Sequence, residues 1–81
     1  MTVRAIIFCK IEVNAMKRVI EKLNAIPQIK KLMSLTGAYD AIAEIETETP
    51  EELYDIFSQK IDQIEGIIDT NTHVVMKSWE K

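Results

Sequence analysis

The amino-acid sequence predicts an α+β fold in which a strand-helix-strand unit occurs twice. An alternating apolar segment opens the chain, and two later segments repeat apolar residues at three- and four-residue spacing. The two glycines and two prolines fall at the junctions between these segments, where turns and helix ends are expected. The chain has 81 residues, so residues 1–81 are expected to form a single domain.

The first unit begins with a strand over residues 2–13. One face of this strand carries Val3, Ala5, Ile7, Cys9 and Ile11, and the other carries Ile6 and Phe8. Apolar residues on both faces are typical of a central strand. A helix follows, with Asn14 as its expected N-cap and Pro27 at its end. Its apolar stripe is Met16, Val19, Ile20, Leu23 and Ile26.

Two strands are expected between the helices. Residues 28–35 form the first, and Lys30 and Lys31 suit an edge strand because charge there blocks unwanted pairing. Gly37 provides a turn, and residues 39–47 form the next strand. Ala41, Ala43 and Ile45 share one face of that strand, with Ile42 and Glu44 on the other.

The second helix has a clear start signal. Thr49 is the expected N-cap, Pro50 takes the first helical position, and Glu52 lies at the third. Its buried stripe is Leu53, Ile56, Phe57, Ile61 and Ile64. Gly66 ends the helix, and residues 67–77 form the last strand. Ile68, Thr70, Thr72, Val74 and Met76 share one face of that strand.

This element order predicts a ferredoxin-like βαββαβ plait, with an antiparallel four-stranded sheet and two helices on one face. The opposite face would be bare, yet the first strand is apolar on both sides. A large bare apolar patch usually marks an interface. We therefore expect two sheets to pack face to face in a homodimer, through Ile6, Phe8 and Ile42.

Charge is divided unevenly along the chain, although the net charge is only −3. Residues 1–39 carry seven Lys/Arg and two Asp/Glu, a charge of +5, and residues 40–81 carry three and eleven, a charge of −8. Complementary charges can steer self-association, and solvated helix surfaces give the same pattern.

Catalytic and metal chemistry have little support. Cys9 lies in an apolar run, where it is expected to pack as a small hydrophobe, and His73 is the single histidine. The sequence has no Cys-x-x-Cys, no His pair and no glycine-rich phosphate loop. The acids Glu44, Glu46 and Glu48 are expected to form a solvated strand end. No enzyme activity, cofactor or metal is therefore expected.

Composition also excludes several partners. The central strands lack the aromatic and basic residues of an RNA-binding plait, and both helices are needed to cover the sheet, so direct nucleic-acid binding is not expected. No apolar run reaches the ~18 residues of a membrane span, and no signal peptide is recognisable. A single cysteine fits a reducing compartment, so a cytoplasmic protein is expected.

One constellation could bind a small ligand. Gly37 permits a tight turn with free backbone N–H groups for a carboxylate, Asp40 can pair with an ammonium group, and Tyr39 offers an aromatic wall. These parts suit a zwitterion such as a free amino acid, although common turn chemistry also explains them. The candidate site consists of Thr36, Gly37, Ala38, Tyr39, Asp40, Thr70 and Thr72.

The sequence resembles the C-terminal effector domain of the Lrp/AsnC regulators, called RAM (regulation of amino-acid metabolism). The resemblance covers nearly the whole chain. It is carried by Thr36-Gly37-x-Tyr39-Asp40, by Ile64-Glu65-Gly66-Ile67 and by Thr70-x-Thr72. It implies the βαββαβ plait, dimerisation through the sheet, and assembly of dimers into octamers or similar rings. It also implies that amino-acid effectors bind near the turn containing Gly37, Tyr39 and Asp40, at contacts between dimers.

The full regulators carry an N-terminal helix-turn-helix, whereas this sequence begins at the first strand and looks like a stand-alone domain. The resemblance therefore implies an amino-acid-binding, oligomeric regulatory domain that could co-assemble with a full-length Lrp/AsnC regulator. Two alternatives stay open. One is a small enzyme on a dimeric plait, similar to the small monooxygenases, which need His, Asn or Trp on the sheet face. The other is a purely structural assembly module.

Overall fold

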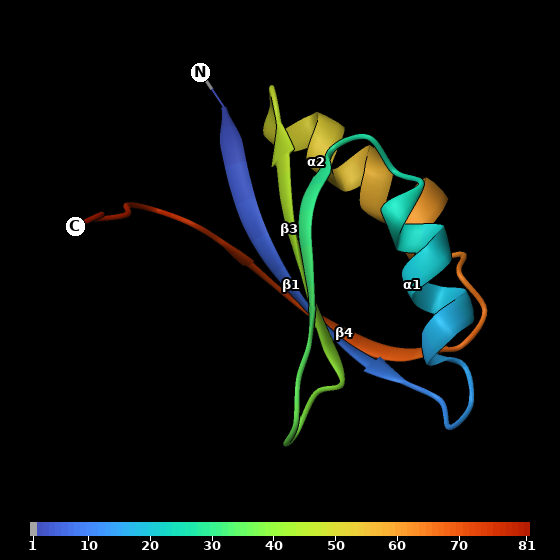
Figure 1. The fold of residues 1–81 in the computed structure, drawn as a ribbon. Helices are drawn as coiled ribbons and strands as arrows, with labels where there is room; N and C mark the ends of the chain where they lie inside the picture. Colours follow the sequence, from blue (N-terminus) through green and yellow to red (C-terminus); the bar gives the residue numbers. More distant parts are fainter. Residues whose placement is uncertain (1) are drawn as a thin grey trace.

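A four-stranded antiparallel sheet carries all the helical segments on one of its faces (Figure 1). The computed structural model describes residues 2–81. Its elements are β1 (Val3–Ile11), α1 (Met16–Asn24), β2 (Ile29–Ser34), β3 (Ala41–Thr47), α2 (Pro50–Ile56), η1 (Phe57–Ile61) and β4 (Ile67–Val74). The strand order is β2-β3-β1-β4, so β1 and β3 are central. The predicted ferredoxin-like plait is confirmed.

The core lies between the helices and the near face of the sheet. Ile7, Val19, Leu23, Ile45 and Ile61 are fully buried there. The predicted alternation in β1 and β3 is confirmed, because their helix-facing residues are buried, apart from Val3, while the intervening ones are half-buried or exposed. We call the far side of the sheet, which no helix covers, the open face.

The start of α2 is held by side chains, as predicted. Thr49 Oγ1 accepts a hydrogen bond from the backbone N–H of Glu52 at 3.1 Å. Glu52 Oε1 in turn accepts one from the N–H of Glu48 at 2.7 Å. The helix does not stay α-helical throughout, because its last turn widens into the π-helix η1. There the N–H of Asp62 donates to the carbonyl of Phe57, five residues back, at 2.7 Å.

Asn14 is not the N-cap of α1. Ala15 occupies that position, and no side chain caps it. Asn14 instead has a φ of +70° in the turn after β1, a conformation that Asn tolerates better than most residues. Across from this turn, the carbonyl of Gly66 accepts a hydrogen bond from the N–H of Glu12 at 2.8 Å. The two loops at this end of the sheet are therefore tied together.

The last strand is shorter and less regular than predicted. It ends at Val74 rather than at residue 77, because the N–H of Val75 makes the final backbone bond, to the carbonyl of Arg4 near the start of β1. Residues beyond it run away from the body as a tail (Figure 1). Asp69 pairs with Lys10 and Ile67 with Ile11, so Ile68 is an extra residue in a bulge.

Cys9 is fully buried, and burial raises the pKa of its thiol to about 11. The thiolate is the reactive form, so we expect native Cys9 to resist a thiol reagent at pH 8 and to react at once in denaturant. The thiol of Cys9 ionises at lower pH in the unfolded chain than in the folded one. Its contribution therefore lowers the free energy of unfolding as pH rises from about 9 to 11. Rapid labelling of folded protein at pH 8 would contradict the burial.

Candidate functional site

The turn between β2 and β3 exposes backbone donors. It is closed by a hydrogen bond from Leu35 N to the carbonyl of Asp40, and the N–H of Asp40 donates to the carbonyl of Cys9 on β1, both at 2.9 Å. Within residues 2–81, the N–H groups of residues 36–39 have no hydrogen-bond partner. Gly37 has a φ of +110° with open space around its α-carbon. The turn can therefore receive an anionic group such as a carboxylate.

Asp40 has a structural contact that the sequence did not indicate. Its Oδ2 accepts a hydrogen bond from the backbone N–H of Ile11 at 2.8 Å. The ladder between β1 and β3 ends at the pair Cys9 and Ala41, so the N–H of Ile11, which points to the β3 side, has no backbone partner there. Asp40 thus ties the turn to β1 with one carboxylate oxygen, and its negative charge and second oxygen stay available to a ligand.

Tyr39 lies on the open face within a small aromatic and polar cluster. Its ring centroid is 5.5 Å from that of Phe8, and Phe8 meets His73 edge-on at 5.7 Å. The amide of Asn71 donates to the Tyr39 hydroxyl at 3.3 Å. Asn71 is not among the residues that the sequence alone singles out. Only the register, which places Asn71 opposite Phe8, shows that β4 adds polar groups to this face.

Thr70 and Thr72 lie on the other side of the sheet. They pair with Cys9 and Ile7, whose side chains face the helices. Thr72 there borders an apolar groove beside α2. The sheet therefore separates these two hydroxyls from the Tyr39 ring, and one chain does not bring all seven predicted site residues together.

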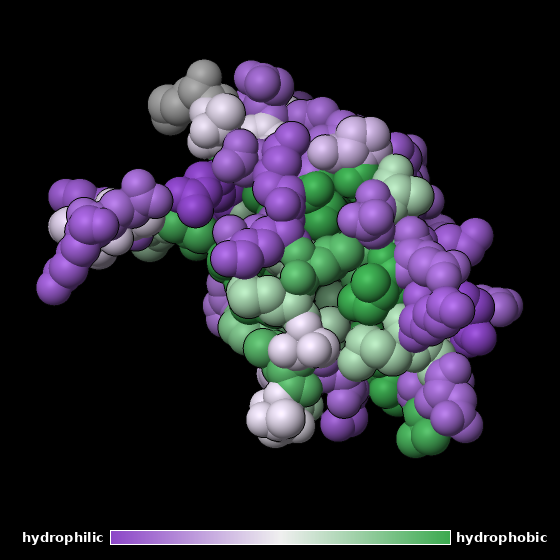
Figure 2. Space-filling model, viewed as in Figure 1, coloured by the Kyte–Doolittle hydropathy of each residue, from purple (hydrophilic) through white to green (hydrophobic). Residues whose placement is uncertain are grey.

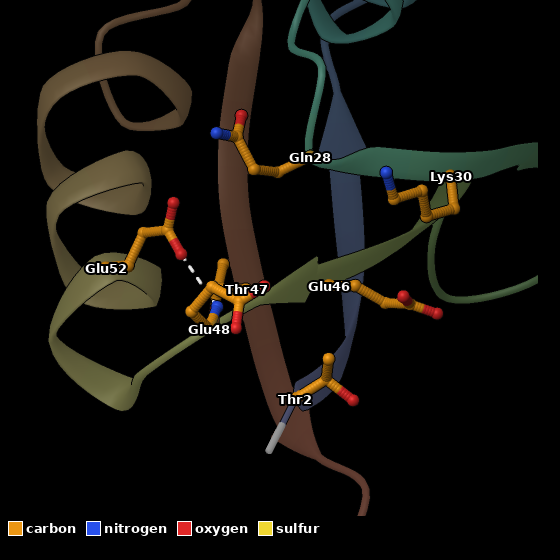
Figure 3. A pocket seen from close by; sticks show the side chains of 7 residues that line it. All are labelled: Thr2, Gln28, Lys30, Glu46, Thr47, Glu48 and Glu52. Carbon is orange, nitrogen blue, oxygen red and sulfur yellow. Dashed lines mark hydrogen bonds between the residues drawn. The ribbon is translucent and has the colours of Figure 1, made fainter.

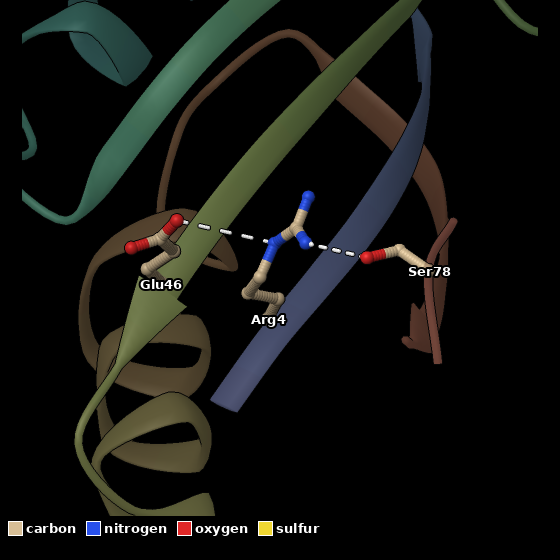
Figure 4. Close-up of polar contacts among 3 residues, drawn as sticks. All are labelled: Arg4, Glu46 and Ser78. Atoms are coloured by element: carbon tan, nitrogen blue, oxygen red, sulfur yellow. Dashed lines mark hydrogen bonds and ion pairs between the residues drawn. The ribbon is translucent and has the colours of Figure 1, made fainter. Parts of the chain in front are cut away.

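The open face has an apolar centre and a charged margin. Ile6, Phe8 and Ile42 are all half-buried at its centre, as expected for an unpartnered face. At the margin, Arg4 Nε lies 3.9 Å from Glu46 Oε1, and another of its nitrogens donates to Ser78 Oγ in the tail at 3.3 Å (Figure 4).

Apolar surface is also visible over β2 and the neighbouring part of α1 (Figure 2). A hollow of about 230 Å³ there is lined by Met16, Ile20, Leu32, Met33 and Ser34. Met33 pairs with Ile42 and so belongs to the open face. Apolar surface thus reaches from the centre of the open face to the edge strand.

A polar pocket of about 250 Å³ lies at the far end of β3, where that strand leads into α2 (Figure 3). It is lined by Thr2, Gln28, Lys30, Glu46, Thr47, Glu48 and Glu52. Glu52 is engaged by the N–H of Glu48, and Glu46 by Arg4. Among residues 2–81, no three His, Cys, Asp or Glu residues are grouped to hold a metal ion. Over the same range, no helix is both long and apolar enough to cross a membrane.

Comparison with known proteins defines the class. The model of the Lrp/AsnC ligand binding domain matches residues 4–81, and the chain belongs to this family. An HTH-type transcriptional regulator of Pyrococcus furiosus, PF1231, is 31% identical over 77 residues, which are 93% of this chain and 52% of the regulator. Homocitrate synthase of Sulfurisphaera tokodaii is 32% identical over 76 residues, which are 93% of this chain and 16% of the enzyme.

Solved structures give the same result. FFRP-DM1 is 31% identical with a TM-score of 0.88, covering 91% of this chain and 99% of that one. A transcriptional regulator of Neisseria meningitidis in complex with L-Met has a TM-score of 0.90, covering 98% of this chain and 53% of the regulator. At 16% identity, that second likeness shows the fold alone.

The chain is therefore an effector-binding regulatory domain of the Lrp/AsnC type. It spans about half the length of the matched regulator and a sixth of the matched synthase. Sequences similar to this domain are thus found both in a transcriptional regulator and in an enzyme.

Proposed function

We propose that this domain binds a free amino acid at the turn of residues 36–40 and transmits the binding through its oligomeric assembly. The exposed donors of the turn suit the carboxylate of the ligand, and the charge of Asp40 suits its ammonium group. The L-Met complex of the Neisseria regulator supports an amino acid as the ligand class. The single observation that carries the proposal is that the unpartnered N–H groups of residues 36–39 lie beside the carboxylate of Asp40.

The sheet separates Thr70 and Thr72 from the ring of Tyr39, and this separation supports a ligand site that two chains share. Thr70 and Thr72 lie on the helix side of edge strand β4, so they can meet the turn of residues 36–40 only from another copy. We propose that the turn of one dimer approaches β4 of a neighbouring dimer, within an octamer or similar ring. Ligand binding would then be coupled to assembly by linkage.

The open face supports the homodimer. Ile6, Phe8 and Ile42 lie at its centre, with the ion pair of Arg4 and Glu46 at the margin, and an apolar centre with a polar rim is the usual anatomy of a protein–protein interface. Packing a second sheet there would remove the exposed apolar area from water.

We propose no catalytic activity for the domain itself, and a cytoplasmic location. The cluster of Tyr39, Asn71 and His73 on the open face is what the enzyme alternative requires. Against that alternative, the dimer proposed above would cover this cluster. The regulator relative supports a role in transcription, through co-assembly with a full-length Lrp/AsnC regulator. The homocitrate synthase relative supports a second role, as a ligand-responsive module acting on an enzyme.

Asp40→Asn is the variant that tests the ligand site. Asparagine keeps an acceptor oxygen for the N–H of Ile11 and removes the negative charge. We expect it to weaken amino-acid binding about 10- to 100-fold, the range for losing a charge-assisted contact, with little change in Tm. Asp40→Ala would also break the tie to β1, so its effect on binding would be mixed with a loss of stability.

Binding is measured by isothermal titration calorimetry against the twenty amino acids. Thr2→Ala is the matched control, because Thr2 lies away from the turn, and this variant should bind as the wild type does. Equal affinity in wild type and Asp40→Asn would remove Asp40 from the site. If neither the wild type nor either variant bound any amino acid, the result would favour a purely structural assembly module.

A further inference from the structure

A groove between α1 and the segment formed by the end of η1 and the loop after it gathers unpaired positive charge. It has a volume of about 430 Å³ and is lined by Arg18, Lys22, Lys60, Gln63, Ile64 and Glu65. We call it the basic groove. Within residues 2–81, none of its three cations forms an ion pair. Glu65 is the one acid on its margin, so the groove is positive overall.

The walls of the groove come from α1, from η1 and from the loop that follows η1. Arg18 and Lys22 project from α1, and Lys60 from η1. The guanidinium of Arg18 lies close above Gly66, 3.3 Å from where a β-carbon there would be. The half-buried Ile64 adds an apolar patch between the charges. The groove can therefore receive an apolar or aromatic side chain that is flanked by acids.

The same chain displays such a group on α2. Glu51, Tyr54 and Asp55 have the i, i+3, i+4 spacing that places side chains on one helix face, and all three are exposed. Tyr54 is 69% exposed, which is unusual for so large a side chain. Neither acid forms an ion pair within residues 2–81. We call these three residues the acidic ridge.

We propose that the acidic ridge of one copy docks into the basic groove of another copy, with Tyr54 against Ile64 and the acids facing Lys22 and Lys60. The occupant is a second copy because the ridge has the charge and the aromatic knob that the groove lacks. Tyrosine is enriched among the residues that dominate binding energy.

The contact is heterologous, because two different surfaces of the chain meet, so it repeats from copy to copy and closes into a ring or extends as a filament. Both surfaces lie in the helical layer, on the other side of the sheet from the open face (Figure 1). One chain can therefore make this contact and the sheet-to-sheet contact together. The proposal does not depend on where the amino acid binds.

Two reversed-charge variants test the proposal. One is Glu51→Lys with Asp55→Lys, and the other is Lys22→Glu with Lys60→Glu. Each alone places like charges together, so we expect assembly beyond the dimer to require about tenfold higher protein concentration, or more, in low salt. An equimolar mixture of the two variants restores opposite charges and should restore assembly. Tyr54→Ala should weaken assembly without any change of charge.

Mass is measured by light scattering over a range of protein concentrations, with circular dichroism to confirm folding. Lys17→Glu is the matched control, because Lys17 is exposed on α1 but does not line the groove. Unchanged assembly in both reversed variants, or a mixture of folded variants that fails to associate, would overturn the proposal. So would binding of inorganic phosphate or duplex DNA that is lost in the Lys22→Glu, Lys60→Glu variant while mass stays constant.

Discussion

Replacing Gly66 by alanine is expected to destabilise the domain by about 2–5 kcal/mol, because backbone strain and overpacking act together. Gly66 has a φ of +106°, a conformation that L-residues rarely adopt. A β-carbon there would lie 2.8 Å from the β-carbon of Ala15 and 2.9 Å from Cγ2 of Val19. Both neighbours are buried and cannot move aside cheaply.

A domain of this size has a stability of about 4–12 kcal/mol, so Gly66→Ala removes a large fraction of it. Thermal unfolding should show a fall in Tm of roughly 10 °C or more. Gly37→Ala is the matched control, since Gly37 has a similar φ of +110° but open space around it. It should cost only the backbone strain, about 1–2 kcal/mol. Equal losses for the two variants would show that the packing against α1 contributes nothing.

Phe8→Asp is expected to disrupt the proposed homodimer. Phe8 lies at the centre of the open face, between Ile42 on β3 and Asn71 on β4, and contacts both Tyr39 and His73. A carboxylate in the middle of two packed sheets would be buried without a partner, which costs several kcal/mol. We expect the dimer dissociation constant to rise at least about 100-fold, as for other central interface residues.

Sedimentation velocity measures this change directly. Val13→Asp is the matched control, because Val13 is an apolar residue that is 89% exposed in a loop away from the open face. It should remain dimeric. Ile42→Asp should behave as Phe8→Asp does, and circular dichroism should show that the monomers keep their fold. A folded Phe8→Asp protein that is still a dimer would place the dimer interface elsewhere.

The fold could be predicted because its signals are local. The capping of α2 by Thr49 and the alternation in β1 and β3 each depend on a few adjacent residues. The errors arose where distant segments decide the conformation. Asn14 could have capped α1, but the turn needs a residue with positive φ there. The bulge at Ile68 follows from pairing with β1, which the spacing of β4 alone does not reveal.

The candidate site was predicted less completely than the fold, and for the same reason. The sequence identified the turn and its carboxylate, since Gly37 and Asp40 lie only three positions apart along the chain. It did not show that Asp40 already holds the N–H of Ile11. Nor did it show that Thr70 and Thr72 face the helices, because the side on which a strand residue lies depends on register.

Light scattering on the wild-type protein, with and without each amino acid, tests the central claim most directly. We expect an oligomer at least as large as a dimer, whose mass changes with one amino acid or a small group of related ones. A protein that is monomeric at all concentrations, and unaffected by every amino acid, would contradict both the proposed dimer and the proposed effector site.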